Sequence, residues 1–275
     1  MLVNAGRNIF RASPKEKTNM GFLQTIRKKT FHLRYSVMHS RKLPFIILKP
    51  FYLIARFFIL GFPGMQYNIF TRMKYKKHLH QWSNYTCEDR YPELFAICKE
   101  FFKDRENVKI LSFGCSTGEE VYSIHSYLPK AAIIGADINP YNLRQCKKKK
   151  PPKNVGFMHT FSEEYRQSKD FDAIFCLVVL LNVKNRKANV ATEFTFQQFE
   201  KQLSELDEKL KTGGLLFIDR TDFDFMHTSI SDRYSPLDTK GNRTVTERPL
   251  FDANNTKISD KQDSYRVFLK REYSA

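Results

Sequence analysis

The feature that most constrains this chain is a series of short apolar runs, separated by helix-like segments, that begins near residue 88. After a helix-like segment at 88–103, the strand-like runs are 108–113, 132–137, 155–159, 172–179 and 215–219. The clearest helix among them, 192–211, repeats its apolar residues at i+3 and i+4 spacing. Apolar strands that alternate with helices are typical of a parallel sheet covered on both faces. We therefore predict an α/β fold with a doubly wound, mostly parallel sheet and an edge strand at 264–271.

Charge divides the chain into two parts. Residues 1–80 carry 16 Lys and Arg against the single acid Glu16, for a net charge of +15. The other 195 residues carry only +2. We therefore predict a basic, helical N-terminal extension at 1–80 and a separate α/β domain at 81–275. We expect this extension to bind an anionic partner. A membrane surface is favoured, and a nucleic acid is the alternative.

The most apolar stretch, 43–63, lies within this basic extension. Lys49, Pro50 and Arg56 interrupt it, and about eleven residues remain between Pro50 and Gly61, or roughly 16 Å of helix. A bilayer core needs about 30 Å, so a full span is the least favoured interpretation. A helix lying in the membrane interface is favoured, and a hydrophobic lid packed on the domain at 81–275 is the alternative.

The five cysteines are odd in number, and none forms a CxxC pair or a zinc pattern. They indicate reduced thiols and no metal site. The first fifteen residues contain no apolar run of signal-peptide length. We expect a cytoplasmic protein, held peripherally at the inner face of the membrane where residues 1–80 bind lipid.

The strongest local signal is the segment 110–120, ILSFGCSTGEE, in which an apolar strand meets a small-residue turn and then a helix. Gly114 and Gly118 allow the backbone to approach a ligand closely, and the N–H groups at the helix start can bind polar ligand atoms. The spacing differs from the GxGxxG pattern of dinucleotide-binding proteins, which argues against a nicotinamide cofactor.

A second signal is Asp137, which ends the strand-like run 132–137. A carboxylate at the tip of the second strand can accept hydrogen bonds from a ribose diol. The alternative is that Asp137 caps the following helix, although Asn139 before Pro140 is also a suitable cap.

The runs SFGCSTGEEVYSI, GADINPYNL, FDAIFCLVVL and LKTGGLLFID resemble, in order and spacing, the class I (Rossmann-like) S-adenosylmethionine methyltransferases. The STGEE loop is similar to that of the chemotaxis receptor (CheR-type) branch. The resemblance implies S-adenosylmethionine as the cofactor. It implies that the methionine part is held by Gly114, Cys115, Ser116, Thr117, Gly118 and one of the two glutamates, Glu119 or Glu120, of which Glu119 is the candidate. It further implies that Asp137 binds the ribose, that Ile138 contacts the adenine, and that Cys176 and Leu177 line the cofactor cleft.

The chain also departs from these families. Leu177 and Val178 stand where the CheR pattern has an Arg-Asn pair, and the Asn/Asp-Pro-Pro-Tyr motif of amino-group methylases is absent. The resemblance therefore supports cofactor binding and does not extend to a receptor glutamate as the substrate.

Methyl transfer needs an aligned acceptor, and a hydroxyl acceptor also needs a base. Candidate bases follow the fifth strand, where Asp222 and His227 are preferred over Asp219 and Asp224. For each of them the alternative is a solvated loop side chain.

We therefore expect methyl transfer to an unidentified acceptor, such as a membrane-associated glycan, lipid or polar small molecule. The alternatives are a nucleic-acid methyltransferase and a non-catalytic Rossmann-like binding protein.

Overall fold

The computed structural model describes residues 50, 71, 73–75, 78 and 84–272, and every structural statement below concerns these residues. The chain divides into two compact units, 1–66 and 67–275, and the sheet lies in the second. Apart from Pro50, the apolar stretch 43–63 lies outside the described residues, as does most of 1–80, so the predictions for them stay predictions. No helix in the described part of the chain is long and apolar enough to cross a bilayer.

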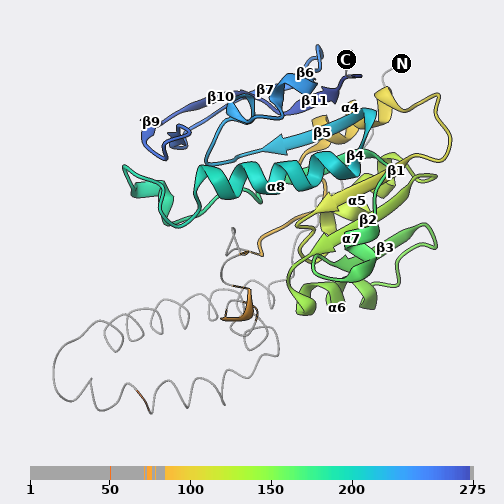
Figure 1. Ribbon diagram of the computed structural model, residues 1–275. Coiled ribbons are helices and arrows are strands. Elements are labelled where there is room, and N and C mark those ends of the chain that lie inside the picture. Colours follow the sequence, from red (N-terminus) through yellow and green to blue (C-terminus); the bar gives the residue numbers. More distant parts are fainter. Residues whose placement is uncertain (1–49, 51–70, 72, 76–77, 79–83, 273–275) are drawn as a thin grey trace, which may run out of the picture. The chain divides into compact units, whose positions relative to one another are not determined.

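Seven strands form one sheet in the order β3–β2–β1–β4–β5–β11–β6 (Figure 1). Their bounds are β1 (Lys109–Phe113), β2 (Ala132–Asp137), β3 (Val155–His159), β4 (Phe171–Leu177), β5 (Leu210–Asp219), β6 (Tyr234–Pro236) and β11 (Val267–Lys270). Strands β1 to β5 run parallel, whereas β11 is antiparallel to both of its neighbours. The predicted doubly wound, mostly parallel sheet is confirmed.

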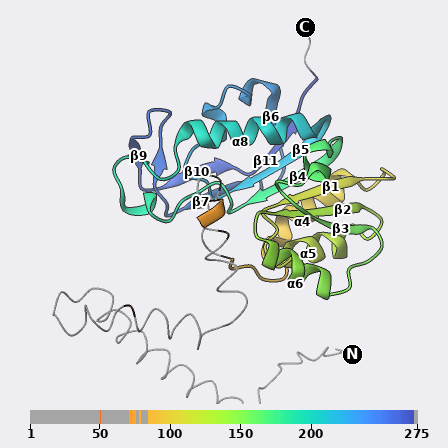
Figure 2. The same cartoon turned by 60° about the horizontal axis from the view of Figure 1, so that its bottom comes forward.

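Helices cover both faces of the sheet. They are α4 (Pro92–Phe101), α5 (Glu119–Tyr127), α6 (Pro140–Lys148), α7 (Glu163–Gln167) and α8 (Phe196–Lys209). Helices α4, α5 and α6 contribute to one hydrophobic core and α7 and α8 to the other, which Figures 1 and 2 show as layers on opposite sides of the strands. Strand β1 sends Ile110 into the first core and Leu111 into the second, because successive side chains of a strand point to opposite faces.

Short elements complete the second unit. Three 3₁₀ turns are Asn185–Lys187, Phe225–His227 and Ser231–Arg233. Two small antiparallel pairs join β7 (Arg243–Thr246) to β10 (Gln262–Tyr265), and β8 (Leu250–Phe251) to β9 (Lys257–Ser259).

Several predicted elements have different bounds in the structure: α4 occupies only part of the helix predicted at 88–103, and β5 extends the strand predicted at 215–219 towards its N-terminal side. The helix predicted at 192–211 begins at Phe196, after a capping box between Thr195 and Gln198, and gives way at Leu210 to β5. Strand β5 begins there because Leu210 pairs with Phe171 of β4. The edge strand predicted at 264–271 is divided in the structure: its first two residues end β10, and β11 lies inside the main sheet because β6 covers its outer side.

The order of the strands creates a crevice. The chain leaves β1 towards β2 and β3, then returns to place β4 on the other side of β1. Neighbouring loops diverge where the direction reverses, and ligands of such sheets bind there, outside the carboxyl ends of the strands.

Candidate functional site

A cavity of about 590 Å³ lies at this crevice. The loop after β1, the ends of β2, β3 and β4, residues 84–91 and one face of α8 form its wall. The predicted cofactor residues that line it are Gly114, Cys115, Ser116, Asp137, Ile138 and Leu177. The structure thus brings six of the ten together around one cavity.

The loop between β1 and α5 has an unusual backbone. Gly114, Ser116 and Gly118 have φ angles of +77°, +50° and +92°, in the left-handed region that favours glycine. A Cβ atom on Gly114 would lie 2.5 Å from Cγ2 of Val179, so the position excludes a side chain on steric grounds as well. Glycine at 114 therefore lets the chain after β1 pass close to the end of β4.

Asp137 is buried in the wall at the end of β2. Its Oδ2 accepts a hydrogen bond from the Ser116 amide at 2.8 Å, and its Oδ1 accepts from the Asn139 amide at 2.7 Å and the Asn142 Nδ2 at 3.2 Å. Burial raises the pKa of Asp137 to about 6, against the lowering effect of these donors. A carboxylate offers about four acceptor positions, so capacity for a ligand hydroxyl remains. The cap of α6 is Asn139, whose Oδ1 accepts from the Tyr141 amide at 3.0 Å.

The two glutamates at the start of α5 point in different directions. Glu120 lines the cavity, and its Oε1 accepts a hydrogen bond from the Ser112 hydroxyl at 2.8 Å. Burial raises the pKa of Glu120 to about 7, although Arg90, also in the wall, favours the charged form. Glu119 instead pairs with Lys149 at 2.7 Å and accepts from the Thr117 hydroxyl at 2.6 Å. Of the two, the structure places Glu120 in the cavity wall.

The other predicted cofactor residues, Thr117, Gly118 and Cys176, do not line the cavity. Gly118 is the left-handed residue that begins α5, and a Cβ there would lie 3.1 Å from the Cys146 sulfur. Cys176 is fully buried, in the core shared with α8.

Two groups of wall residues were not predicted. The first lies before α4 and consists of Asn84, Tyr85, Thr86, Cys87, Arg90 and Tyr91. The Asn84 carbonyl accepts a hydrogen bond from the Ser116 hydroxyl at 3.0 Å, which ties this segment to the loop after β1. No local pattern marks these residues, since only the tertiary fold brings them to the cavity.

The second group comes from α7, α8 and the loop after β3. Helix α8 presents Gln198, Lys201, Gln202 and Glu205, which share one face at helical spacing. The amphipathic pattern of α8 is a signal for this face, but it predicts a solvent-facing polar side. Thr160 and Tyr165 also line the cavity.

Three hydroxyls in this wall suit a polar ligand. Tyr91 Oη, Thr160 Oγ1 and Tyr165 Oη are buried and have no hydrogen-bond partner among the described residues. Buried polar atoms are normally paired, because an unpaired one loses its hydration without compensation. Together with Asp137 and Glu120, these atoms fit a nucleoside joined to an amino acid better than they fit an apolar ligand.

The two predicted bases lie elsewhere. Asp222 is 1% exposed, and its Oδ2 accepts from the Asn182 amide at 2.8 Å and from Asn185 Nδ2 at 2.9 Å. Burial raises the pKa of Asp222 to about 6. His227 is exposed in a 3₁₀ turn, and neither residue lines the cavity. Asp222 ties the loop after β4 to the loop after β5, so its place in the structure is that of a buried anchor.

Over the described ranges, no group of three or more His, Cys, Asp or Glu side chains is placed to hold a metal ion.

Comparison with known proteins identifies the segment that carries the site. Residues 110–214, from β1 into β5, match the model of a family described as a methyltransferase domain. No curated protein matches the chain.

Several solved structures are similar to it. A putative O-methyltransferase from Nostoc punctiforme is 16% identical over 46% of this chain and 36% of its own, with a TM-score of 0.35. The plantazolicin methyltransferase BpumL is 16% identical over 61% of this chain and 57% of its own, with a TM-score of 0.35. Phosphoethanolamine N-methyltransferase 2 from Haemonchus contortus is 17% identical over 50% of this chain and 29% of its own, with a TM-score of 0.34. The chain thus spans less than two thirds of each.

The matched segment contains the loop after β1, Asp137 and the strand order of the class I fold. Residues 110–214 therefore match a methyltransferase domain, and the sheet to which they belong has a class I methyltransferase-like, Rossmann-like α/β fold.

Proposed function

We propose that this chain transfers the methyl group of S-adenosylmethionine to an acceptor that enters the cavity at the carboxyl ends of β1, β2 and β4. The proposal rests on one observation. Asp137 and Glu120, which belong to the matched domain, and Arg90, which precedes it, line the same cavity. The cofactor supplies a methyl group on a positively charged sulfur. The protein supplies binding and alignment.

We propose an orientation for the cofactor from the charges of the wall. Glu120 and Arg90 offer one negative and one positive group, which complement the ammonium and carboxylate of an amino acid. Asp137 has acceptor capacity for a ribose hydroxyl, and Ile138 beside it offers an apolar contact for the base. The neutral hydroxyls of Thr160 and Tyr165 suit the neutral polar edge of a purine. The resemblance implied that one of Glu119 and Glu120 holds the methionine part of the cofactor. We propose Glu120 for this role.

The acceptor is proposed to be a membrane-associated glycan, lipid or polar small molecule. The support is the net charge of +15 on residues 1–80, which favours an anionic surface, and the mixed wall of the cavity. Phe95 and Val178 are apolar, whereas the α8 face is polar. The proposed location follows, in the cytoplasm and peripheral to the membrane. Because Asp222 and His227 do not line the cavity, the proposal assigns most of the rate to alignment of the acceptor.

Calorimetric titration of S-adenosylmethionine and S-adenosylhomocysteine into the full chain tests the cofactor site. We expect micromolar binding, at least tenfold weaker binding by Asp137→Ala, and no binding of NAD. Asp238→Ala removes an exposed acid outside the wall and serves as the matched control. A folded wild-type chain that does not bind either ligand would overturn the proposal.

Label transfer tests the acceptor. The full chain is incubated with methyl-labelled cofactor and, separately, membranes, a small-molecule extract and total RNA. Label in lipid, glycan or small molecules supports the proposed acceptor class, and label in RNA supports the nucleic-acid alternative. Cofactor binding without label in any fraction favours the non-catalytic alternative.

A further inference from the structure

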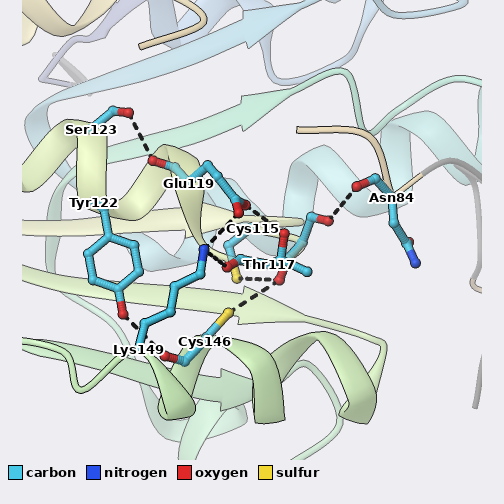
Figure 3. Close-up of polar contacts among 9 residues, drawn as sticks. Asn84, Cys115, Thr117, Glu119, Tyr122, Ser123, Cys146 and Lys149 are labelled. Carbon is cyan, nitrogen blue, oxygen red and sulfur yellow. Dashed lines mark hydrogen bonds and ion pairs between the residues drawn. The ribbon is translucent and has the colours of Figure 1, made fainter. Parts of the chain in front are cut away.

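One lysine of the run 147–150, at the end of α6, contacts the loop 114–118 that follows β1 (Figure 3). Lys149 Nζ donates a hydrogen bond to the Thr117 carbonyl at 3.0 Å and pairs with Glu119 Oε1 at 2.7 Å. The same ammonium group lies 5.5 Å from the centre of the Tyr122 ring. Lys147 and Lys148 are exposed, and among the described residues their side chains make no hydrogen bond or ion pair with the loop. One lysine of the run therefore has a partner set that the others lack.

The loop that Lys149 contacts holds an unfavourable backbone conformation. Ser116 has a φ of +50°, between two glycines that also have positive φ. A residue with a Cβ atom persists in this region only when its surroundings hold it there. The loop therefore depends on contacts from outside itself.

Those contacts come from two sides. On the cavity side, the Ser116 amide donates to Asp137, and the Ser116 hydroxyl donates to the Asn84 carbonyl. On the α6 side, the Ser116 carbonyl accepts from the Cys146 thiol at 3.3 Å, and the Thr117 carbonyl accepts from Lys149. Cys146 of α6 and Lys149 at its C-cap thus hold two successive carbonyls of the loop, as Figure 3 shows for these two side chains.

We infer that Lys149, together with Glu119, is a positioning pair that holds the loop 114–118 in its cofactor-binding conformation. The inference rests on the proposed function, because it concerns affinity for S-adenosylmethionine. Neither residue lines the cavity. When only a fraction of the molecules holds the binding conformation, the apparent affinity falls in proportion to that fraction. Loss of the pair should therefore weaken binding even though no contact with the ligand is removed.

The Lys149 and Glu119 side chains are 40% and 20% exposed, so solvent screens the pair and its contribution to global stability is small. An effect on affinity with little change in the melting temperature therefore distinguishes positioning from a general structural role. Salt provides a second distinction, since the Debye length falls from about 10 Å at 0.1 M to about 3 Å at 1 M.

The experiment is calorimetric titration of S-adenosylhomocysteine into the full chain, with thermal melting of each protein. Lys149→Met removes the charge, Lys149→Arg keeps it, and Lys147→Met and Lys148→Met are matched controls from the same run. We expect the Kd to rise about three- to fivefold for Lys149→Met and to stay at the wild-type value for the two control variants. The Kd of Lys149→Arg should return towards wild type, and the ratio between Lys149→Met and wild type should shrink at 1 M salt.

The outcomes separate the two proposals. If the wild-type chain binds and Lys149→Met binds as tightly as Lys147→Met, the inference is overturned and the proposed function stands. If Lys149→Met loses melting temperature and affinity together and Lys149→Arg restores neither, the lysine is structural and the inference is again overturned. A folded wild-type chain without affinity would overturn the proposed function instead.

Discussion

At the scale of single residues, the two buried acids of the cavity link cofactor binding to pH. Burial raises the pKa of Glu120 to about 7 and that of Asp137 to about 6, so the uncomplexed protein holds protons there that free carboxyl groups would have lost. A ligand ammonium group favours the charged form of Glu120. Binding should therefore release a proton near neutral pH, and affinity should rise with pH until the free group is ionised.

We predict that affinity for S-adenosylhomocysteine rises about three- to tenfold from pH 6 to pH 8. Glu120→Gln should bind more weakly and lose most of this dependence. Glu119→Gln, one position earlier on α5 but outside the cavity wall, should keep it. Calorimetry in buffers of different ionisation enthalpy measures the released protons directly. A wild-type affinity that stays flat over this range would show that Glu120 does not meet the ammonium group.

A second prediction concerns Gly114. Gly114→Ala places a Cβ against Val179 and forces alanine to a φ of +77°, so we expect a loss of about 1–3 kcal/mol in the free energy of unfolding. Gly156→Ala is the matched control, because its φ is not positive and no atom lies within 4 Å of the added Cβ. Urea denaturation of both variants provides the comparison, and equal midpoints would contradict the account of the loop.

At the scale of elements, α8 serves the core on one side and the cavity on the other. Leu203 is fully buried, whereas Gln202 lines the cavity. We predict that Leu203→Ala lowers the free energy of unfolding by about 2–5 kcal/mol and that Gln202→Ala changes it by less than about 0.5 kcal/mol. Urea denaturation measures both. Similar losses for the two variants would mean that the helix face towards the cavity also carries stability.

Local sequence patterns are sufficient to predict those elements whose conformation depends on residues adjacent in the chain. The parallel strands were predicted from apolar runs, and the loop after β1 was predicted from its glycines, because both depend on residues adjacent in the chain. The choice between Glu119 and Glu120 was beyond such patterns. Neighbouring helical residues point about 100° apart, and the packing of α5 on the sheet decides which one meets the cavity.

The unpredicted wall residues share a different cause. Asn84, Arg90 and the polar face of α8 reach the cavity only through the folding of distant segments. Asp222 shows the converse. It follows a strand at the carboxyl edge, as a catalytic acid would, yet its partners Asn182 and Asn185 come from the loop after β4 and bury it. The sequence contains no local sign of that pairing.

At the scale of the whole molecule, the uneven charge leads to a prediction about membranes. The net charge of +15 on residues 1–80 should bind the full chain to anionic vesicles at low salt, and about 1 M salt should release it. Flotation with anionic and with neutral vesicles tests this directly. Equal flotation with both vesicle types would indicate binding by apolar insertion alone. No flotation with either type would indicate that the basic residues bind an anionic partner other than a membrane.

The position of β11 inside the sheet has a consequence for synthesis on the ribosome. Strand β5 gains its outer neighbour only when residues 267–270 have been made, after the whole segment from Arg220 to Arg266. Until then the growing chain carries an open strand edge, which is the part of a sheet most prone to pair with a foreign strand. The nascent protein therefore passes through a period of exposure that ends when β11 enters between β5 and β6, and chaperone demand should be greatest during that interval.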